Sequence, residues 1–458
     1  MTTASASTPT RTRDEIIALD KRLIWRPYTR MDTYIRDTQP VVARAASGIY
    51  IDDMDGTRYI DGNGSWWTNI VGHNHPHLMA ALVESSRRLT HCTFAGITHE
   101  GAVALAEKLL PLLGPSFARL FFSDNGSTAV EVAVRMAYQY WRNVGRPQKC
   151  RFVTFEGAFH GETLGCASVS GVPVFHAALG DLVFDAVRLP SPARCAEAEH
   201  PDDALAETFR AAEQLLQERA DEIAAVIIEP LIQGAAGMLM YPPHYLKRLA
   251  ALCRQQDVLL IVDEVFTGYG RTGAFLAQHQ AEINADITCL AKGFSGGVLP
   301  MAATAVSQRV FDAFLGSAEK TLWYGHSFTG NPLGCAVSLA TLEVIQDQDL
   351  VAKSHAAGQR LQQRLDVLAK RFSFVRAPRR YGLVGAFTLS FGDDARSNDY
   401  LDDAGWRFYA AAKQHGALLR PLGNVVYFVL PLTITPAEVD ALGDIVERAL
   451  ATAFPQAI

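Results

Sequence analysis

The 458-residue sequence contains few cysteines and no long apolar run. Its seven cysteines stand singly and form no C-x-x-C pair, which argues against a disulfide framework or a zinc site. No apolar segment approaches the roughly 20 residues that a helix needs to cross a bilayer. The net charge of -6 offers no basic face to a nucleic acid. We therefore expect a reduced, cytoplasmic protein with no metal site and no nucleic-acid or membrane partner.

Residues 1–13 are rich in Ser and Thr and contain two arginines, Arg11 and Arg13. This composition is compatible with a transit peptide, but the stretch is short and runs directly into Asp14 and Glu15. We expect it to be a disordered tail.

Short apolar runs alternate with longer amphipathic segments from about residue 119 onward. Six runs are expected to form strands: 119–123, 150–155, 224–229, 258–264, 287–291 and 302–306. Several are apolar almost throughout, which is typical of strands covered on both faces. Between them, residues 128–143 place an apolar stripe on one helix face, and residues 204–219 are rich in helix formers. The pattern predicts an α/β fold with a mostly parallel sheet.

The two flanks of the chain differ from this core. Residues 48–52 and 55–59 predict a hairpin, and residues 382–391 predict a strand after a long helical pattern. We interpret the flanks, residues 14–75 and 336–458, as one small domain that accompanies a large domain over residues 76–335.

Lys292 follows an apolar run and precedes the flexible stretch 293–297. Burial disfavours a charged ammonium group, and the neutral amine is the form that attacks an aldehyde, so this position suits a Schiff-base lysine. An ordinary lysine whose head reaches solvent beside a loop is the alternative. The residue alone does not decide between them.

Two carboxylates, Asp263 and Glu264, end the apolar run 258–262. Open α/β sheets bind ligands at this end of their strands. One of the carboxylates could pair with the ring nitrogen of a cofactor. A helix N-cap or a metal ligand is the alternative.

Residues 121–128 predict a strand, a small polar turn and the start of a helix. The free N–H groups of a helix N-terminus, together with the Ser127 hydroxyl, make a phosphate site. Thr128 and Glu131 also have the spacing of a capping box, and capping and anion binding can coexist.

Two further patterns invite readings that the context does not support. Residues 268–273 match G-x-G-x-x-G, but they do not directly follow a strand, and no acidic residue ends a strand about 20 residues on. A nicotinamide dehydrogenase is therefore only a distant alternative, which titration with NAD would test. His73, His75 and His77 suggest a metal, but Pro76 fits the first turn of a helix, so we expect a loop and a helix start.

Taken in order, Asp263, the G-x-G-R-T-G sequence at 268–273 and Lys292 before a Gly-rich turn resemble the class III aminotransferases. These are fold-type I enzymes that depend on pyridoxal 5'-phosphate (PLP). The resemblance covers nearly the whole chain. It implies a mostly parallel seven-stranded sheet in the large domain, a small α+β domain built from both chain ends, and a homodimer with shared sites. It also makes residues 268–273 a structural turn.

The resemblance implies a role for each matching residue. Lys292, as the Schiff-base lysine, and Asp263, as the partner of the pyridine nitrogen, would be catalytic. The cofactor would further contact Gly126, Ser127, Phe159, His160, Glu229, Val265 and Ser327, the last from the neighbouring subunit. The substrate would contact Tyr28, Trp66, Trp67, Arg271, Gly325 and Arg420. The guanidinium fork of Arg420 suits a carboxylate.

Five stretches resemble the corresponding segments of family members that aminate 8-amino-7-oxononanoate in biotin synthesis. They are residues 25–29, 64–67, 96–99, 137–141 and 420–424. Adjacent Trp66 and Trp67 would form a flat apolar wall for a long aliphatic chain, or else a packed loop anchor. The implied amino donor is S-adenosylmethionine, with lysine as the alternative. Phe159, Glu162 and His326 depart from the family's usual Tyr, Asp and Pro and leave the donor open.

Other interpretations keep the cofactor and change the role. They are another ω-amino-acid or diamine transaminase, a glutamate-semialdehyde aminomutase, a dialkylglycine decarboxylase, and a non-catalytic regulator with a PLP-enzyme fold.

Overall fold

A computed structural model describes residues 11–392 and 400–457. The first ten residues of the predicted tail lie outside this range. Thr12 caps helix α1 (Arg13–Leu23), and its side chain and that of Glu15 form a reciprocal capping box. The helix therefore begins at the last residue of the predicted tail.

A seven-stranded sheet forms the centre of the molecule, in the order β4-β12-β11-β10-β7-β5-β6. Its strands are β4 (Phe117–Ser123), β5 (Arg151–Phe155), β6 (Val187–Leu189), β7 (Ile223–Ile228), β10 (Leu259–Asp263), β11 (Ile287–Leu290) and β12 (Ala302–Ser307). β12 is antiparallel to both of its neighbours, and the other pairings are parallel. All six predicted strands are confirmed. The seventh, β6, is a three-residue edge strand that the apolar pattern does not reveal.

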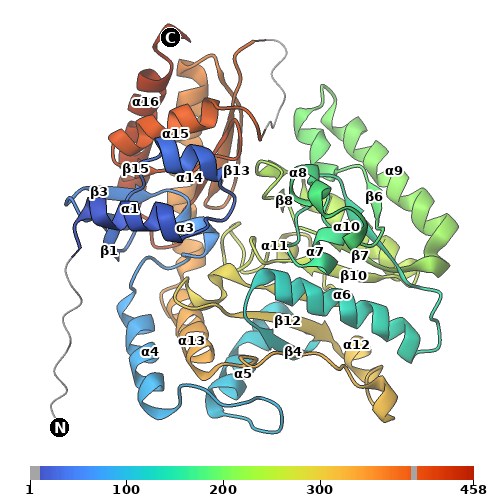
Figure 1. The fold of residues 1–458 in the computed structure, drawn as a ribbon. Coiled ribbons are helices and arrows are strands. Elements are labelled where there is room, and N and C mark those ends of the chain that lie inside the picture. The colour runs from blue at the N-terminus through green and yellow to red at the C-terminus, as the bar shows by residue number, and fades with distance from the viewer. Residues whose placement is uncertain (1–10, 393–399, 458) are drawn as a thin grey trace, which may run out of the picture.

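Helices cover both faces of this sheet. Every residue of β7 and β10 is buried, as expected for strands covered on both faces. Helix α6 (Gly126–Asn143) contacts β7, β10, β11 and β12 with its predicted apolar stripe, which is buried. Helices α9 (Pro201–Arg219) and α10 (Pro243–Gln255) pack together, and α10 contacts β10. In Figure 1, α6 runs along the near side of the sheet.

The two chain ends meet in smaller sheets. One has the order β1 (Ala43–Ser47), β2 (Tyr50–Asp53), β3 (Arg58–Asp61) and β15 (Ala417–Leu418), and the other β13 (Val375–Tyr381), β14 (Val384–Leu389) and β16 (Val425–Val429). β15 pairs in parallel with β3, placing Ala417 opposite Ile60. In Figure 1 the blue N-terminal elements lie beside the red C-terminal ones. The predicted hairpin corresponds to the antiparallel pair β2–β3. The domain boundaries at residues 75 and 335 stay predictions.

The remaining α-helices surround these sheets. They are α2 (Met31–Asp37), α3 (Gly64–Trp67), α4 (Pro76–Arg88), α5 (Glu100–Leu113), α7 (Leu164–Ser168), α8 (Pro173–His176), α11 (Ala277–Gln280), α12 (Gln308–Asp312), α13 (Pro332–Asp347), α14 (Leu350–Arg371), α15 (Ala404–Gln414) and α16 (Pro436–Ala453). Helix α4 starts at Pro76, as predicted. Within the described ranges, no helix combines the length and apolar character needed to cross a membrane.

Candidate active site

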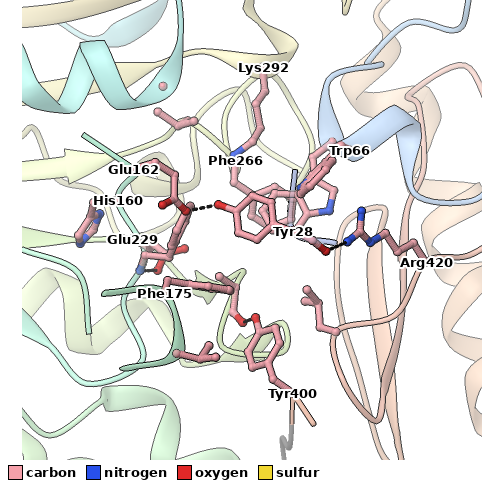
Figure 2. Close-up of a pocket in the computed structure, with 18 of the residues that line it drawn as sticks. Tyr28, Trp66, His160, Glu162, Phe175, Glu229, Phe266, Lys292, Tyr400 and Arg420 are labelled. Carbon is pink, nitrogen blue, oxygen red and sulfur yellow. Dashed lines mark hydrogen bonds between the residues drawn. The ribbon is translucent and has the colours of Figure 1, made fainter. Parts of the chain in front are cut away.

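A cavity of about 630 Å³ opens where several strands of the central sheet end. Asp263 ends β10, Glu229 follows β7, and Lys292 follows β11, and all three line the cavity. Because these strands are parallel, their carboxyl ends meet at one edge of the sheet, where open α/β sheets bind ligands. Residues from the two chain ends, including Tyr28 and Arg420, complete the cavity wall (Figure 2).

Lys292 reaches into this cavity from the first position of a short 3₁₀ helix (Lys292–Ser295). Its backbone lies in the left-handed region, with φ 50°. Its Nζ lies 4.8 Å from the ring centroid of Trp67 and 6.0 Å from that of Phe266. Burial lowers the pKa of Lys292 to about 8, although the negative charges of Asp263 and Glu229 act to raise it. A larger fraction of the amine is therefore neutral and nucleophilic near neutral pH than in an ordinary lysine.

Asp263 is the cavity carboxylate of the pair that ends β10. Its Oδ2 lies 2.7 Å from Nδ1 of His160, and its Oδ1 accepts the N–H of Val265 at 3.0 Å. His160 is buried, and its Nε2 has no hydrogen-bond partner among the described residues. A buried carboxylate held on both oxygens can face a cationic ring nitrogen without losing its position.

Glu264 points away from the cavity. It accepts hydrogen bonds from Thr267 Oγ1 and from the N–H of Gln278, and burial raises its pKa to about 7. Successive side chains of a strand alternate between faces, so one of the two carboxylates had to turn away.

Glu229 is a buried residue of the cavity wall. Its two oxygens accept the N–H groups of Phe159 and Gly234, both at 3.0 Å. Burial raises the pKa of Glu229 to about 7, although these bonds lower it. Glu229 thereby fixes the backbone that places Phe159, whose ring lines the cavity and contacts Phe175.

The N-terminus of α6 points at the cavity, and Gly126 and Ser127 line it. A Cβ on Gly126 would come within 2.7 Å of Val265 Cγ1, so the backbone lies tight against the end of β10. The Ser127 Oγ accepts the N–H of Glu162 at 3.0 Å. The arrangement leaves N–H groups of the first helical turn facing a concave surface, which suits a phosphate.

The predicted capping box of Thr128 with Glu131 is wrong. Asn125 is the N-cap of α6, and its side chain and that of Thr128 form the box one turn earlier. Glu131 instead accepts a hydrogen bond from Thr163 Oγ1 at 2.6 Å. The helix starts earlier than the sequence suggested because Asn125 reaches the Thr128 N–H.

Tyr28 closes the mouth of the cavity. Its hydroxyl donates to Glu162, and burial together with this bond raises the pKa of Tyr28. Arg420 Nη2 donates to the backbone oxygen of Tyr28 at 2.9 Å, and its guanidinium lies 4.9 Å from the ring centroid of Trp66. Figure 2 shows Glu162 and Arg420 on opposite sides of Tyr28. The mouth therefore carries one carboxylate and one guanidinium within an aromatic frame.

Trp66 and Trp67 both line the cavity, but at different depths. Trp66 is 42% exposed at the mouth, whereas Trp67 is 5% exposed and packs on Phe266 with 4.5 Å between ring centroids. The expected flat wall is thus a stepped one. Residues 65–67 all have positive φ, from 45° to 73°. For residues with a Cβ this costs roughly 1–2 kcal/mol each, so the turn must be held by its surroundings.

Three predicted site residues are not among the described residues that line the cavity: Arg271, Gly325 and Ser327. Arg271 is buried beneath the cavity wall, where Nη2 donates to the oxygen of Trp67 at 2.6 Å and Nε to that of Phe266 at 2.9 Å. Burial lowers the pKa of Arg271 to about 9. Its role as a substrate ligand stays a prediction.

The loop that holds Gly325 and Ser327 precedes α13. Trp323 in this loop is 81% exposed, and Phe328 is also exposed. Their exposure leaves a large apolar surface beside the segment predicted to reach a neighbouring subunit.

Several cavity residues were missed by sequence reasoning: Phe175, Phe266, Tyr400, Trp406 and Tyr427. They come from separate loops and elements and share no sequence pattern. Glu162, one of the departures from the family pattern, also lines the cavity.

The three histidines at 73–77 have different surroundings. His73 Nε2 lies 2.9 Å from Asp61, His77 Nε2 lies 2.7 Å from Glu343, and His75 is the N-cap residue of α4. Among the residues that the structure describes, no group of His, Cys, Asp or Glu side chains could hold a metal ion.

Comparisons with known proteins agree with this architecture. The family model described as aminotransferase class-III matches residues 33–450. An adenosylmethionine-8-amino-7-oxononanoate aminotransferase from Geobacter sulfurreducens is 41% identical, with 94% of this chain and 96% of that protein covered. A crystal structure of the enzyme of that name from Methanocaldococcus jannaschii has a TM-score of 0.90 at 31% identity and covers 96% of this chain and 99% of its own.

A second solved structure is an amine transaminase from an uncultivated Pseudomonas species in its PLP-bound form. It has a TM-score of 0.89 at 34% identity and covers 94% of this chain and 99% of its own. The fold and the site together define a fold-type I, PLP-dependent transferase. The chain belongs to the class III aminotransferase family.

Proposed function

We propose that this enzyme converts 8-amino-7-oxononanoate to 7,8-diaminononanoate in biotin synthesis. The observation that carries the proposal is one cavity lined by both Lys292, beside a buried carboxylate, and Arg420, in an aromatic mouth. The relatives named for this reaction cover nearly the whole chain and support it. The amino donor is S-adenosylmethionine, with lysine as the alternative.

The residues around the cavity fit PLP. Lys292 would hold its aldehyde carbon, and Asp263, oriented by His160, would pair with its ring nitrogen. Gly126 and Ser127 would receive the phosphate, because the cradle beside Val265 leaves no room for a Cβ at Gly126. Phe159 would cover one ring face, with Glu229 fixing its backbone. PLP, when bound, supplies a carbonyl group for the amino donor and a ring that withdraws electrons from the reacting carbon.

The side chains of this protein then perform three tasks. Lys292, whose pKa is lowered, would serve as the base that accepts the proton from the donor Cα. The negative charge of Asp263 keeps the ring nitrogen protonated. Tyr28, Trp66 and Trp67 exclude water and hold the aliphatic chain, while Arg420 receives the distant carboxylate.

We further propose a homodimer in which Gly325 and Ser327 approach the phosphate bound by the neighbouring subunit. The exposed Trp323 and Phe328 support this, because burying them would favour association. We also propose a reduced, cytoplasmic setting, which the seven singly placed cysteines of the sequence support because they form no C-x-x-C pair.

Stopped-flow absorbance tests the substrate assignment. PLP-loaded enzyme is mixed with S-adenosylmethionine or with lysine, and the spectrum of the bound cofactor is followed. 8-Amino-7-oxononanoate is then added, and the product is identified by mass spectrometry. Formation of 7,8-diaminononanoate with either donor supports the proposal, and its absence with both contradicts it.

A second candidate is an amine transaminase of broader range. The similarity to the Pseudomonas amine transaminase favours it. Rapid reaction with a simple aromatic amine that lacks a carboxylate, and none with either proposed donor, would establish this alternative.

A further inference from the structure

Asp61 lies beside the turn that carries the two cavity tryptophans. It ends β3, and its side chain is 5% exposed. Its Oδ2 accepts the hydroxyl of Ser65 at 2.7 Å and lies 2.9 Å from Nε2 of His73. Asp61, Ser65 and His73 are not among the described residues that line the cavity. The trio therefore supports the site from outside.

We propose that Asp61 is a positioning residue of the active site. It holds Ser65, and through Ser65 the left-handed turn that sets Trp66 at the mouth and Trp67 beside Lys292. His73 in turn holds Asp61. The inference rests on the proposed function for its kinetic part, but the conformation of the turn can be measured without any substrate.

The turn needs a hydrogen bond of this kind because its residues have positive φ, whereas residues with a Cβ prefer negative φ. Ser65, Trp66 and Trp67 have φ of 45°, 61° and 73° in succession. Residues with a Cβ visit this region singly and rarely, so a free segment of this sequence would relax to negative φ. Relaxation would rotate both indoles out of their places in the cavity wall.

The two ends of the turn are fixed by different side chains. At its end, Arg271 donates to the oxygen of Trp67 at 2.6 Å. At its start, Gly64 lies against β16, where an added Cβ would come within 2.8 Å of the Val429 oxygen. The Ser65 hydroxyl, bonded to Asp61, holds the first residue that has a Cβ. Without it, strain can be released from the start of the turn.

His73 is suited to hold Asp61 because its own backbone is anchored. His73 exchanges two backbone hydrogen bonds, of 3.1 Å and 2.7 Å, with Gly48, which lies in the turn between β1 and β2. The imidazole therefore approaches the carboxylate from a fixed point. The charge of Asp61 makes its hydrogen bonds with Ser65 and His73 stronger than those of a neutral acceptor would be.

Two substitutions at Ser65 test whether its hydroxyl acts by fixing the backbone of the turn or in some other way. Ser65→Ala removes the hydrogen bond to Asp61 but leaves a residue with a Cβ at positive φ. We expect kcat/KM to fall about tenfold to a hundredfold. Ser65→Gly also removes this hydrogen bond, but glycine adopts positive φ without a steric cost, so it should recover much of the loss. Equal impairment of both variants would overturn the proposal, because it would mean that the hydroxyl acts directly.

Substitutions at Asp61 test the other side of the bond. Asp61→Ala should lower kcat/KM as far as Ser65→Ala, whereas Asp61→Asn keeps an acceptor oxygen and should retain most activity. Asp53→Ala is the matched control. Asp53 is also buried in this sheet and accepts hydrogen bonds from Asp55, Thr57 and Tyr59. None of these three residues belongs to the turn at residues 65–67. It should lower thermal stability and leave kcat/KM unchanged.

A crystal structure and near-ultraviolet circular dichroism of Ser65→Ala provide the conformational measurement. We expect residues 65–67 to leave the left-handed region and the tryptophan bands to change, whichever substrate the enzyme uses. An unaltered turn with both indoles in place would overturn the proposal even if 8-amino-7-oxononanoate is the substrate. Ser65 is exposed, so its variants keep the test valid if Asp61→Ala does not fold.

Discussion

His160 Nδ1 and Asp263 Oδ2 lie 2.7 Å apart at the carboxyl end of β10. The second oxygen of Asp263 accepts the N–H of Val265, so bonds to two different oxygens fix the plane of the carboxylate. A charge held in this way can stabilise a cationic ring nitrogen without reorganising during the reaction.

Asp263→Asn should therefore lower kcat by about a hundredfold or more, because the amide keeps the shape and loses the charge. PLP should remain bound, since Lys292 and the N-terminus of α6 are unchanged. Steady-state kinetics and the absorbance of bound PLP measure the two effects. Asp286→Asn is the control, because Asp286 precedes β11 at the opposite edge of the sheet and should leave kcat unchanged. Near-normal kcat in Asp263→Asn would refute the role.

Lys292→Ala should abolish turnover and covalent retention of PLP. Borohydride treatment followed by mass spectrometry should label the wild-type protein and not this variant. Lys149→Ala is a matched control, because Lys149 is another buried lysine whose pKa burial lowers to about 8, and it bonds to Ala220 away from the cavity. It should retain the label. Multiple turnovers by Lys292→Ala at a near-normal rate would exclude the proposed role.

The capture of PLP by the cofactor-free protein should depend on pH through Lys292. The neutral amine is the reactive form, so the rate should rise with pH and level off above about 8, where the lysine is deprotonated. An unperturbed lysine would keep gaining reactivity up to about pH 10.4. Stopped-flow absorbance at a series of pH values distinguishes the two curves. A rate that continues to climb beyond pH 9.5 would contradict the lowered pKa.

Arg420→Ala should raise KM for 8-amino-7-oxononanoate by about tenfold to a hundredfold, because a charged hydrogen bond to its carboxylate is lost. An acceptor of equal length that lacks the carboxylate should show little change. Arg407→Ala removes another arginine of this region, which lies over Phe454 and donates to Ala453, and should alter neither KM. Equal losses with both acceptors would indicate that Arg420 instead supports Tyr28.

A shared active site predicts complementation between inactive subunits. Refolding a mixture of Lys292→Ala and Ser327→Ala chains should give dimers in which one site has both native residues. The activity of the mixture should exceed that of either parent, and analytical ultracentrifugation should show a dimer. Activity no higher than the mean of the two parents would place Ser327 outside the neighbouring site.

Much of the fold was predictable because the strands of the central sheet are buried on both faces and therefore appear as apolar runs in the sequence. The edge strand β6 was not, because three residues with an exposed Arg188 carry no such pattern. Lys292 and Asp263 were predictable as a pair because Asp263 lies at the end of one predicted strand and Lys292 follows another strand of the same sheet. Parallel strands bring their carboxyl ends to the same edge.

The sequence by itself determined the family, the cofactor lysine and the positions of six strands along the chain, since these depend on local patterns. The tertiary structure shows that Asp263 rather than Glu264 faces the cavity, as the family resemblance implied, and it alone placed Arg271 under Trp67. It also brought Tyr28 to Glu162, which is 134 residues away. Such contacts depend on how distant segments pack, and packing is set by the shape of the whole core rather than by any local pattern.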